Sequence, residues 1–180
     1  MNQLLMHLSE LSDLPPIPFL NDGMQLRIAT SADASELASL LAAAFAPTHE
    51  WDVDRVNAEL LECADVPTSY IISDCDAIVA TASVLLRADQ ALNAGYLHWV
   101  AVNPSWQGQG LGYVVSLAVL HELARLGRSG ASLKTDDHRL AAIKTYLKLG
   151  FVGVCNCDED VDRWARISLI LPSVGTEQAS

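Results

Sequence analysis

Residues 101–117 read AVNPSWQGQGLGYVVSL, and the interpretation of the whole chain depends on this stretch. Gly108, Gly110 and Gly112 alternate between an apolar run typical of a strand and an apolar run typical of a helix. Glycines at such a place often form only a tight turn. They also leave backbone N–H groups bare at the positive end of a helix, where an anion binds readily. From the glycines alone, both interpretations stay open.

The segments on either side of the glycines predict a mixed sheet. Three strand patterns in succession precede them, which favours antiparallel pairing. The β-α-β unit over residues 96–135 needs a crossover connection and hence a parallel pair. The strand patterns lie at residues 25–30, 69–73, 77–86, 95–102, 131–135, 151–155 and 164–171, and the helical patterns at residues 33–45, 53–61, 111–126 and 136–149.

This order of elements predicts an α/β (α+β) fold. We expect a mixed, mostly antiparallel central sheet that contains one parallel β-α-β unit and has helices on both faces. Residues 24–172 are the expected domain, and residues 173–180 are a tail.

Residues 1–23 are expected to form an N-terminal arm that ends in a proline-rich linker, since prolines at 15, 16 and 18 force an extended connection. The arm is interpreted as helical and as packing on its own domain or on a neighbour, so a homodimer is one expected partner. The interpretation as a helix depends on three leucines at helical spacing, Leu4, Leu8 and Leu11.

Charge and hydropathy exclude several classes of protein. The chain has 22 acidic and 11 basic residues, a net charge of −11, which repels phosphate backbones and anionic lipids. We therefore expect neither a nucleic acid nor a membrane as partner, although the same field would attract a cationic small molecule. No apolar run reaches the ~18 residues of a membrane span. Without the basic start and cleavage site of a secretory signal, the expected location is cytoplasmic.

The sequence predicts no metal site. The four cysteines form no CxxC pair, and in a cytoplasmic chain they are expected to be free thiols. The acidic run Asp158–Asp162 is similar to the start of a calcium loop, but Arg163 stands where that loop has its glycine and Leu169 where it has its glutamate.

Two phosphate-binding motifs fit the glycine stretch poorly. A dinucleotide fingerprint, GxGxxG, would need a third glycine where Tyr113 stands, although Asp136 lies where such a fingerprint often has its ribose ligand. A P-loop is excluded because no GK[ST] follows the glycines. A nicotinamide-binding oxidoreductase therefore remains a third-ranked alternative.

Residues 102–112 read VNPSWQGQGLG, and residues 142–151 read AIKTYLKLGF. The first block resembles the acyl-CoA signature of the GNAT superfamily of N-acyltransferases, Q/R-x-x-G-x-G/A after a strand, with Gln107, Gly110 and Gly112 at its fixed positions. The second block is similar to the helix end A-x-x-x-Y-x-x-x-G-F of that family. The blocks have the family's order and usual separation, and the resemblance covers residues 24–171.

The resemblance implies acetyl-CoA as co-substrate. It implies that the pyrophosphate binds the backbone of the glycine loop, and that the pantetheine arm runs beside a strand that splays from its neighbour and pairs with it as an added strand would. A backbone N–H near Val100 would polarise the acyl carbonyl. Arg139 stands where the family often has an asparagine that holds the arm, and arginine suits CoA phosphates. The implied ligands are Val100, Ala101, Val102, Gln107, Gly108, Gln109, Gly110, Leu111, Gly112 and Arg139.

Acyl transfer to an amine also requires two proton transfers. Tyr146 resembles the tyrosine with which the family protonates the departing thiolate; otherwise it is a core aromatic residue. For the base, alternation along residues 95–102 predicts Tyr96, His98, Val100 and Val102 on one face of a strand. His98 would then lie two residues before the carbonyl site, with a pKa near its usual ~6.5, and is either a general base or a hydrogen-bonded sheet histidine.

The predicted function is N-acetyl transfer from acetyl-CoA to a primary amine by direct transfer in a ternary complex. The alternative is a non-catalytic CoA-binding sensor or interaction module with the same fold. The acceptor is expected to be a small-molecule or peptide amine, received by the loop Pro47–Asp52, unless this loop is merely solvated.

Overall fold

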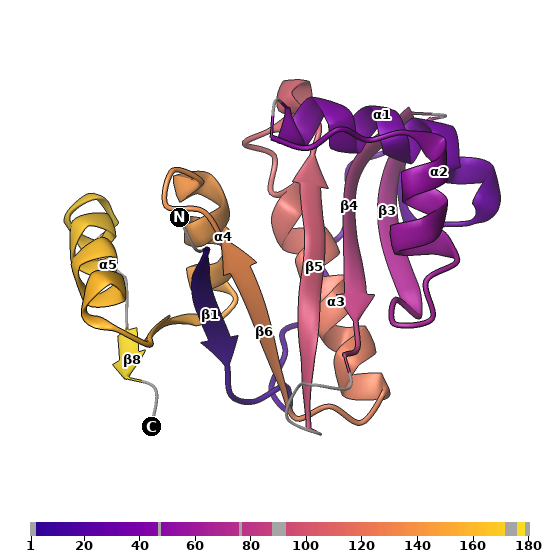
Figure 1. Ribbon diagram of the computed structural model, residues 1–180. Coiled ribbons are helices and arrows are strands. Elements are labelled where there is room, and N and C mark those ends of the chain that lie inside the picture. The colour runs from indigo at the N-terminus through magenta and orange to yellow at the C-terminus, as the bar shows by residue number, and fades with distance from the viewer. Residues whose placement is uncertain (1–2, 47, 76, 88–92, 172–175, 179–180) are drawn as a thin grey trace.

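The computed structural model describes residues 3–46, 48–75, 77–87, 93–171 and 176–178. A single twisted sheet runs through the molecule, with helices on both sides (Figure 1). Its strand order is β2-β3-β4-β5-β6-β1-β7-β8. Two neighbouring pairs are parallel, β5 with β6 and β7 with β8, and the other pairs are antiparallel. The strands are β1 (Leu4–Leu8), β2 (Met24–Ile28), β3 (Thr68–Asp74), β4 (Ala77–Leu85), β5 (Ala94–Val102), β6 (Gly130–Thr135), β7 (Val152–Cys155) and β8 (Thr176–Gln178).

The helices divide into two groups, one on each face of the sheet. On one face, α1 and the short α2 pack over β3 to β5 around a core that includes Leu37, Leu41 and Ile71. On the other face, α3, α4 and α5 form a larger core with the sheet. The helices are α1 (Ala34–Phe45), α2 (Val53–Val56, continued by the π-helical turn Asn57–Leu61), α3 (Leu111–Arg125), α4 (Leu140–Lys148) and α5 (Asp158–Ile170). The predicted fold class is confirmed.

The N-terminal segment is a strand and not the helix that its leucine spacing predicts. β1 lies inside the sheet, antiparallel to β6 on one side and to β7 on the other. Leu4 and Met6 are fully buried in the core, and Leu5 and His7 point to the opposite face. A strand inside a sheet can be apolar on both faces, so leucines recur without strict alternation, and the pattern is easily mistaken for that of a helix.

The last predicted strand, residues 164–171, is also wrong, because this segment belongs to helix α5. Three acidic residues, Asp158 to Asp160, occupy its first turn, where negative charge is favourable. Trp164 and Ile167 are buried at helical spacing, and the Trp164 ring covers Gly153 of β7. The position in the sheet beside β6 is occupied by β1 instead.

Candidate functional site

The site begins with an irregularity in β5. His98 pairs with Ser83 of β4 and Ala101 pairs with Thr81, so β5 has one residue more than β4 between these two pairs. Trp99 takes up this extra residue with a φ of 43°, a left-handed conformation that is strained for a bulky side chain. Such strained residues cluster at functional sites.

The bulge changes which side chains share a face. Trp99 and Ala101 belong to the core below α1 and α2, whereas Val100 and Val102 pack against the opposite core. His98 lines a cavity on the α1 side. The prediction that His98, Val100 and Val102 lie on one face is therefore wrong, because strict alternation does not survive a bulge.

β5 and β6 separate in the middle of the sheet. Their parallel ladder joins Ala94 to Gly130, Gly95 to Ala131 and Tyr96 to Ser132, and in the described part of the chain it extends no further. Beyond Tyr96 the two strands diverge toward their carboxyl ends (Figure 1). Their facing backbone groups are then available to a ligand that pairs as a strand does.

The glycine loop lies between the end of β5 and helix α3. Gly108 and Gly110 have φ of 82° and 79°, and a Cβ added to either would meet no protein atom within 4 Å. Tyr113 and Val114 donate the first hydrogen bonds of the helix, both to the Gly110 carbonyl. The N–H groups that precede them lie at an exposed helix N-terminus, where such groups lack intrahelical partners.

The third glycine of this loop has a packing role. A Cβ at Gly112 would lie 3.4 Å from Cγ2 of Val102, so the helix begins close against the end of β5. The predicted ligands Gln107, Gly108, Gln109 and Gly110 are all exposed, whereas Leu111 is buried in the core below them. The loop is therefore an open cradle at a helix N-terminus, a place where anions can bind.

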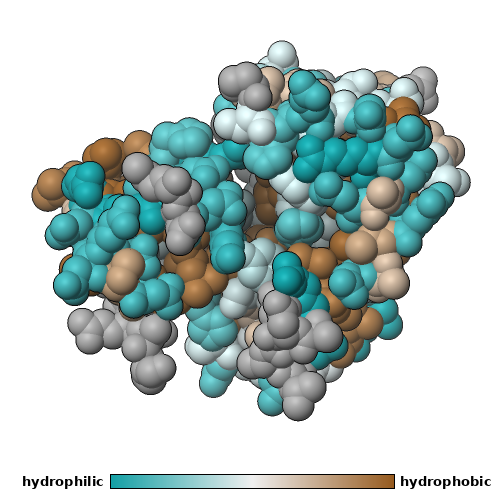
Figure 2. All heavy atoms as spheres, in the orientation of Figure 1, coloured by the Kyte–Doolittle hydropathy of each residue, from teal (hydrophilic) through white to brown (hydrophobic). Residues whose placement is uncertain are grey.

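A cavity of about 650 Å³ opens on the α1 side of the diverging strands. Figure 2 shows this face hollowed between the half that carries α1 and α2 and the half that carries α4 and α5. Among the residues predicted from the sequence, it is lined by His98, Val100, Arg139 and Tyr146. The glycine loop is not part of this lining, so the predicted site has two regions, which the carboxyl-terminal half of β5 connects.

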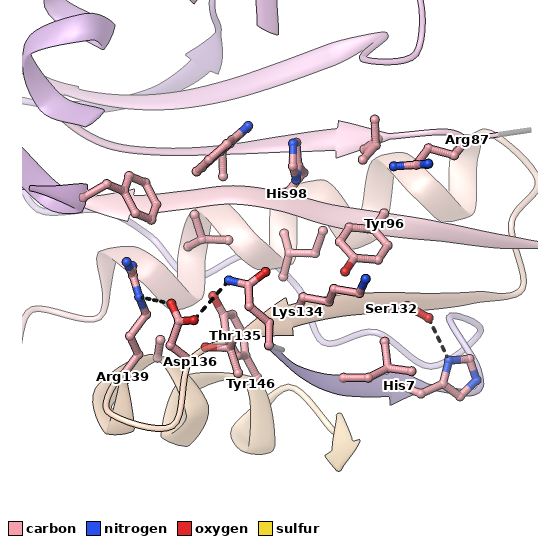
Figure 3. Close-up of a pocket in the computed structure, with 18 of the residues that line it drawn as sticks. His7, Arg87, Tyr96, His98, Ser132, Lys134, Thr135, Asp136, Arg139 and Tyr146 are labelled. Carbon is pink, nitrogen blue, oxygen red and sulfur yellow. Dashed lines mark hydrogen bonds and ion pairs between the residues drawn. The ribbon is translucent and has the colours of Figure 1, made fainter. Parts of the chain in front are cut away.

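Tyr146 projects from α4 into the cavity and is 6% exposed (Figure 3). Its ring packs edge-on against Phe151, with 6.1 Å between centroids. Burial raises the pKa of the phenol well above its usual value, and the nearby Arg139 opposes this only in part. Tyr146 therefore keeps its proton at neutral pH and can act as a proton donor.

His98 lies on the opposite wall, between Tyr96 and Trp99. The ring centroids are 6.2 Å from Tyr96 and 5.1 Å from Trp99. Burial lowers the pKa of His98 to about 4, with Arg87 lowering it and Glu59 raising it by smaller amounts. The expectation of a pKa near the ordinary histidine value is wrong. At neutral pH the imidazole is uncharged and can accept a proton or a hydrogen bond.

Arg139 lines the cavity. Its Nε donates to Oδ2 of Asp136 at 3.0 Å, and its guanidinium lies 4.6 Å from the centroid of the Phe45 ring. This contact joins α4 to the end of α1 across one end of the cavity. The described structure thus pairs Arg139 with a carboxylate and an aromatic ring rather than with the glycine loop.

The loop after α1, which was expected to receive the amine, contributes aromatic rings rather than acidic groups to this region. His49 lines the cavity, with its ring centroid 5.3 Å from that of Trp99. Trp51 is buried against Trp99 at 4.7 Å and is covered by the Arg55 guanidinium. Glu50 and Asp52 are exposed, and Asp52 caps α2. Pro47 lies outside the described residues.

Several residues of the cavity are absent from the sequence prediction. They come from the N-terminal segment, residues 3–8, and from β6, and were missed because this segment was interpreted as a helix and because β6 carries no motif. Alternation along β6, which places two polar residues on the face opposite Leu133, is the signal that could have identified two of them. The missed residues are Gln3, His7, Ser132 and Lys134.

All four cysteines are free thiols, as predicted. Among the described residues, the histidines, cysteines and acidic side chains form no group of three or more that could hold a metal ion. In the same residues, no helix has both the length and the apolar character that crossing a bilayer requires.

Comparisons with known proteins agree with this geometry. The model of the acetyltransferase (GNAT) family matches residues 35–151. Mycothiol acetyltransferase of Tsukamurella paurometabola is 31% identical over an alignment of 153 residues, which covers 78% of this chain and 52% of that protein. The enzyme of the same name from Mycolicibacterium smegmatis is 31% identical over 168 residues, 83% of this chain and 52% of that protein. The chain thus spans about half the length of these curated relatives.

Solved structures have the same fold. A GCN5-related N-acetyltransferase from Kribbella flavida superposes with a TM-score of 0.60 at 24% identity, covering 85% of this chain and 55% of that one. The protein yncA from Salmonella typhimurium, solved with its cofactor acetyl-CoA, superposes with a TM-score of 0.59 at 20% identity, covering 72% of this chain and 79% of that one.

Proposed function

The chain belongs to the acetyltransferase (GNAT) family, and on that premise we propose that it transfers the acetyl group of acetyl-CoA to a primary amine. The family match makes it an acyltransferase, and the relatives named mycothiol acetyltransferase support acetyl transfer. Because the chain spans about half of those relatives, its acceptor and mechanism are inferred from its own residues.

One observation supports the proposal most. The open glycine cradle and the acceptor-side cavity lie at opposite ends of the stretch of β5 that has left its neighbour β6. A ligand with a diphosphate at one end and a thioester at the other, joined by a chain that can pair with a strand, fits this arrangement. Acetyl-CoA has these three parts and would supply an acyl group activated as a thioester.

The residues present fit this co-substrate. Backbone N–H groups at the start of α3, from Gly108 to Gly112, would hold the diphosphate, and the lack of side chains at Gly108 and Gly110 leaves room for it. The freed backbone of Val100, Ala101 and Val102 would pair with the pantetheine amides. A backbone N–H at Val100 would then stabilise the negative charge that develops on the carbonyl oxygen.

His98 and Tyr146, on opposite walls of the cavity, would carry out the proton transfers. The acceptor ammonium first loses one proton to solvent, and His98, neutral at physiological pH, hydrogen-bonds to the free amine and takes its second proton during attack, directly or through water. The amine nitrogen then bonds to the carbonyl carbon as the carbon–sulfur bond breaks. Tyr146, which keeps its proton, donates to the departing sulfur. The products are an N-acetylated amine, CoA with a free thiol and one proton.

The positions of the cysteines support direct transfer in a ternary complex. None of the four lines the cavity, so no thiol is placed to carry the acyl group covalently. Transfer then requires both substrates to be bound at once.

A thiol-release assay with acetyl-CoA and a panel of amines tests the proposal, alongside calorimetric titration of CoA. We expect CoA to bind and thiol release to depend on an amine. Tight CoA binding without amine-dependent thiol release would instead support a non-catalytic CoA-binding module. No CoA binding by the folded protein would overturn both.

A further inference from the structure

Within the proposed function, we propose that the acceptor amine also carries an anionic group, and that Lys134 binds this group on the floor of the cavity. The inference names the class of acceptor for the site described above, and therefore rests on the proposed acetyl transfer. It depends on the charges of the cavity, on the position of Lys134, and on the polar groups around it.

The cavity has a charge opposite to that of the rest of the protein. The chain as a whole has 22 acidic and 11 basic residues. Among the described residues, the cavity is lined by three basic residues, Arg87, Lys134 and Arg139, and by one acidic residue, Asp136, and Arg87 has an interaction of its own. An excess of positive charge in the cavity of an acidic protein indicates a function for that charge, and a ligand of opposite sign is the simplest one.

The single carboxylate of the lining is already engaged. Oδ2 of Asp136 accepts from Arg139 at 3.0 Å, and Oδ1 accepts from Nε2 of Gln3 at 3.3 Å. Since Asp136 neutralises Arg139, neither of this pair offers net charge to a substrate. The ammonium of Lys134 has no carboxylate within ion-pairing distance among the described residues.

Lys134 is placed on the face of the sheet that forms the cavity. In β6 it alternates with the buried Leu133 and Thr135, and it pairs with Leu5 of β1. Its side chain extends along the cavity toward Tyr96 in Figure 3. Because β5 and β6 separate beyond Tyr96, this position lies beside the gap through which the acetyl group would reach the amine.

Lys134 shares the cavity lining with several hydrogen-bonding groups. Ser132, two residues earlier on the same face, has its hydroxyl 3.2 Å from Nδ1 of His7. Tyr96 contributes a phenol that burial keeps protonated, since it raises the pKa of that group. One cation with hydroxyl and imidazole groups nearby is a suitable site for a single carboxylate or phosphate group. It is unfavourable for a second ammonium, so polyamine acceptors are excluded.

The proposal is tested by the binding of N-acetylated compounds, which correspond to the reaction products. They lack the ionisable amine, so differences in amine basicity do not affect the comparison. With CoA present, N-acetyl-L-phenylalanine is compared with N-acetyl-L-phenylalaninamide, and N-acetyl-O-phosphoethanolamine with N-acetylethanolamine, by calorimetry. We expect at least one anionic member to bind about 10-fold more tightly than its neutral partner, because a charge-assisted hydrogen bond is replaced by a neutral one. The two pairs separate carboxylate from phosphate.

Variants then assign the preference to Lys134. Lys134→Ala is expected to remove the preference by weakening only the anionic ligand, and Lys134→Arg to retain most of it. Lys144→Ala is the matched control, since Lys144 is an exposed lysine on α4 outside the cavity. Equal binding of charged and neutral partners by the wild type, or a preference that survives Lys134→Ala, would overturn the inference.

The two proposals fail in different ways. If no amine releases thiol from acetyl-CoA, the proposed function fails, whichever N-acetylated compounds bind in the calorimeter. If thiol is released but neither anionic product is preferred, acetyl transfer stands and the anionic acceptor is wrong.

Discussion

Tyr96 and Ser132 form the last pair of the parallel ladder between β5 and β6, and beyond them the two strands separate. Both side chains line the cavity. The site thus begins where the ladder ends. A few residues further along β5, the bulge at Trp99 also interrupts the regular pairing of β5 with β4. Residues that touch this region should affect binding and catalysis more than stability, and the predictions below separate these effects.

Gly110→Ala should weaken CoA binding by 10-fold or more. A Cβ there meets no protein atom, but it enters the space in which we place the diphosphate. The left-handed backbone also costs a non-glycine residue about 1–2 kcal/mol.

Gly127→Ala is the control for that strain. Gly127 ends α3 with a φ of 75°, and it too has open space around it. Calorimetry of CoA binding and thermal unfolding should show similar losses of stability in both variants and a loss of affinity only in Gly110→Ala. If Gly110→Ala and Gly127→Ala bound CoA with equal affinity, the glycine loop would not be part of the CoA site.

Tyr146→Phe should lower kcat by about 10²-fold while the KM for acetyl-CoA changes little, because it removes one general acid and retains the buried ring. The packing against Phe151 is preserved, so the melting temperature should stay within a few degrees. Tyr70→Phe, on β3 and outside the cavity, is the control. If Tyr146→Phe had the same kcat as Tyr70→Phe, Tyr146 would be a packing residue without a role in catalysis.

The pH dependence of kcat/KM should report His98. Because burial lowers its pKa to about 4, the imidazole is in its basic form at pH 5 and above, and kcat/KM, corrected for the fraction of acceptor present as free amine, should fall only as the pH approaches 4. His98→Gln should lower kcat/KM by 10-fold or more across this range and remove that acidic limb. An acidic limb near pH 6.5 in the wild type, or one that persists in the variant, would identify another group as the base.

The same shift has a consequence for stability. The folded pKa of His98 lies below the unfolded value of ~6.5, so folding disfavours the protonated form. The free energy of unfolding should therefore decrease as the pH falls from about 6.5 to about 4, and His98→Gln should make this decrease smaller. Urea unfolding of the two proteins at several pH values measures it, and parallel curves would contradict the buried imidazole.

Gly153→Ala should destabilise the protein by about 1–3 kcal/mol, as over-packing of a core does. An added Cβ would lie 2.5–2.8 Å from ring atoms of Trp164, so the ring must move. Trp164→Leu in the same background should recover part of the loss by making room. If Gly153→Ala were neutral in urea unfolding, α5 would not pack on β7 in this way.

Much of the fold was predictable from the sequence because the relevant segments are locally consistent. β3, β4 and β5 follow one another as predicted, and the glycines at 108 and 110 adopt the positive φ that only glycine tolerates easily. The divergence of β5 from β6 was expected only through the family resemblance, since no pattern within either strand specifies it.

The failures have physical causes. Met6 and Leu4 are buried in β1, and this alternation was available in the sequence, but leucine spacing supported a helix equally well. In α5 the buried residues Arg163, Trp164 and Ile167 follow helical spacing, which the apolar run at the end of the segment obscured. At Trp99 one inserted residue reverses the faces of the strand, and such a bulge has no signature in a single sequence.

The insertion of β1 joins the two ends of the chain. β6 and β7 each pair with β1 and, among the described strands, not with each other, so the sheet is continuous only when residues 4–8 fill the slot between them. The pairing of β1 with β6 closes a loop that includes most of the chain, and such closure is slow. We therefore expect β7 to join the sheet only after β1 has paired with β6. A chain shortened by its first residues would have an open slot bounded by two strand edges, which a synthetic peptide of that sequence could fill.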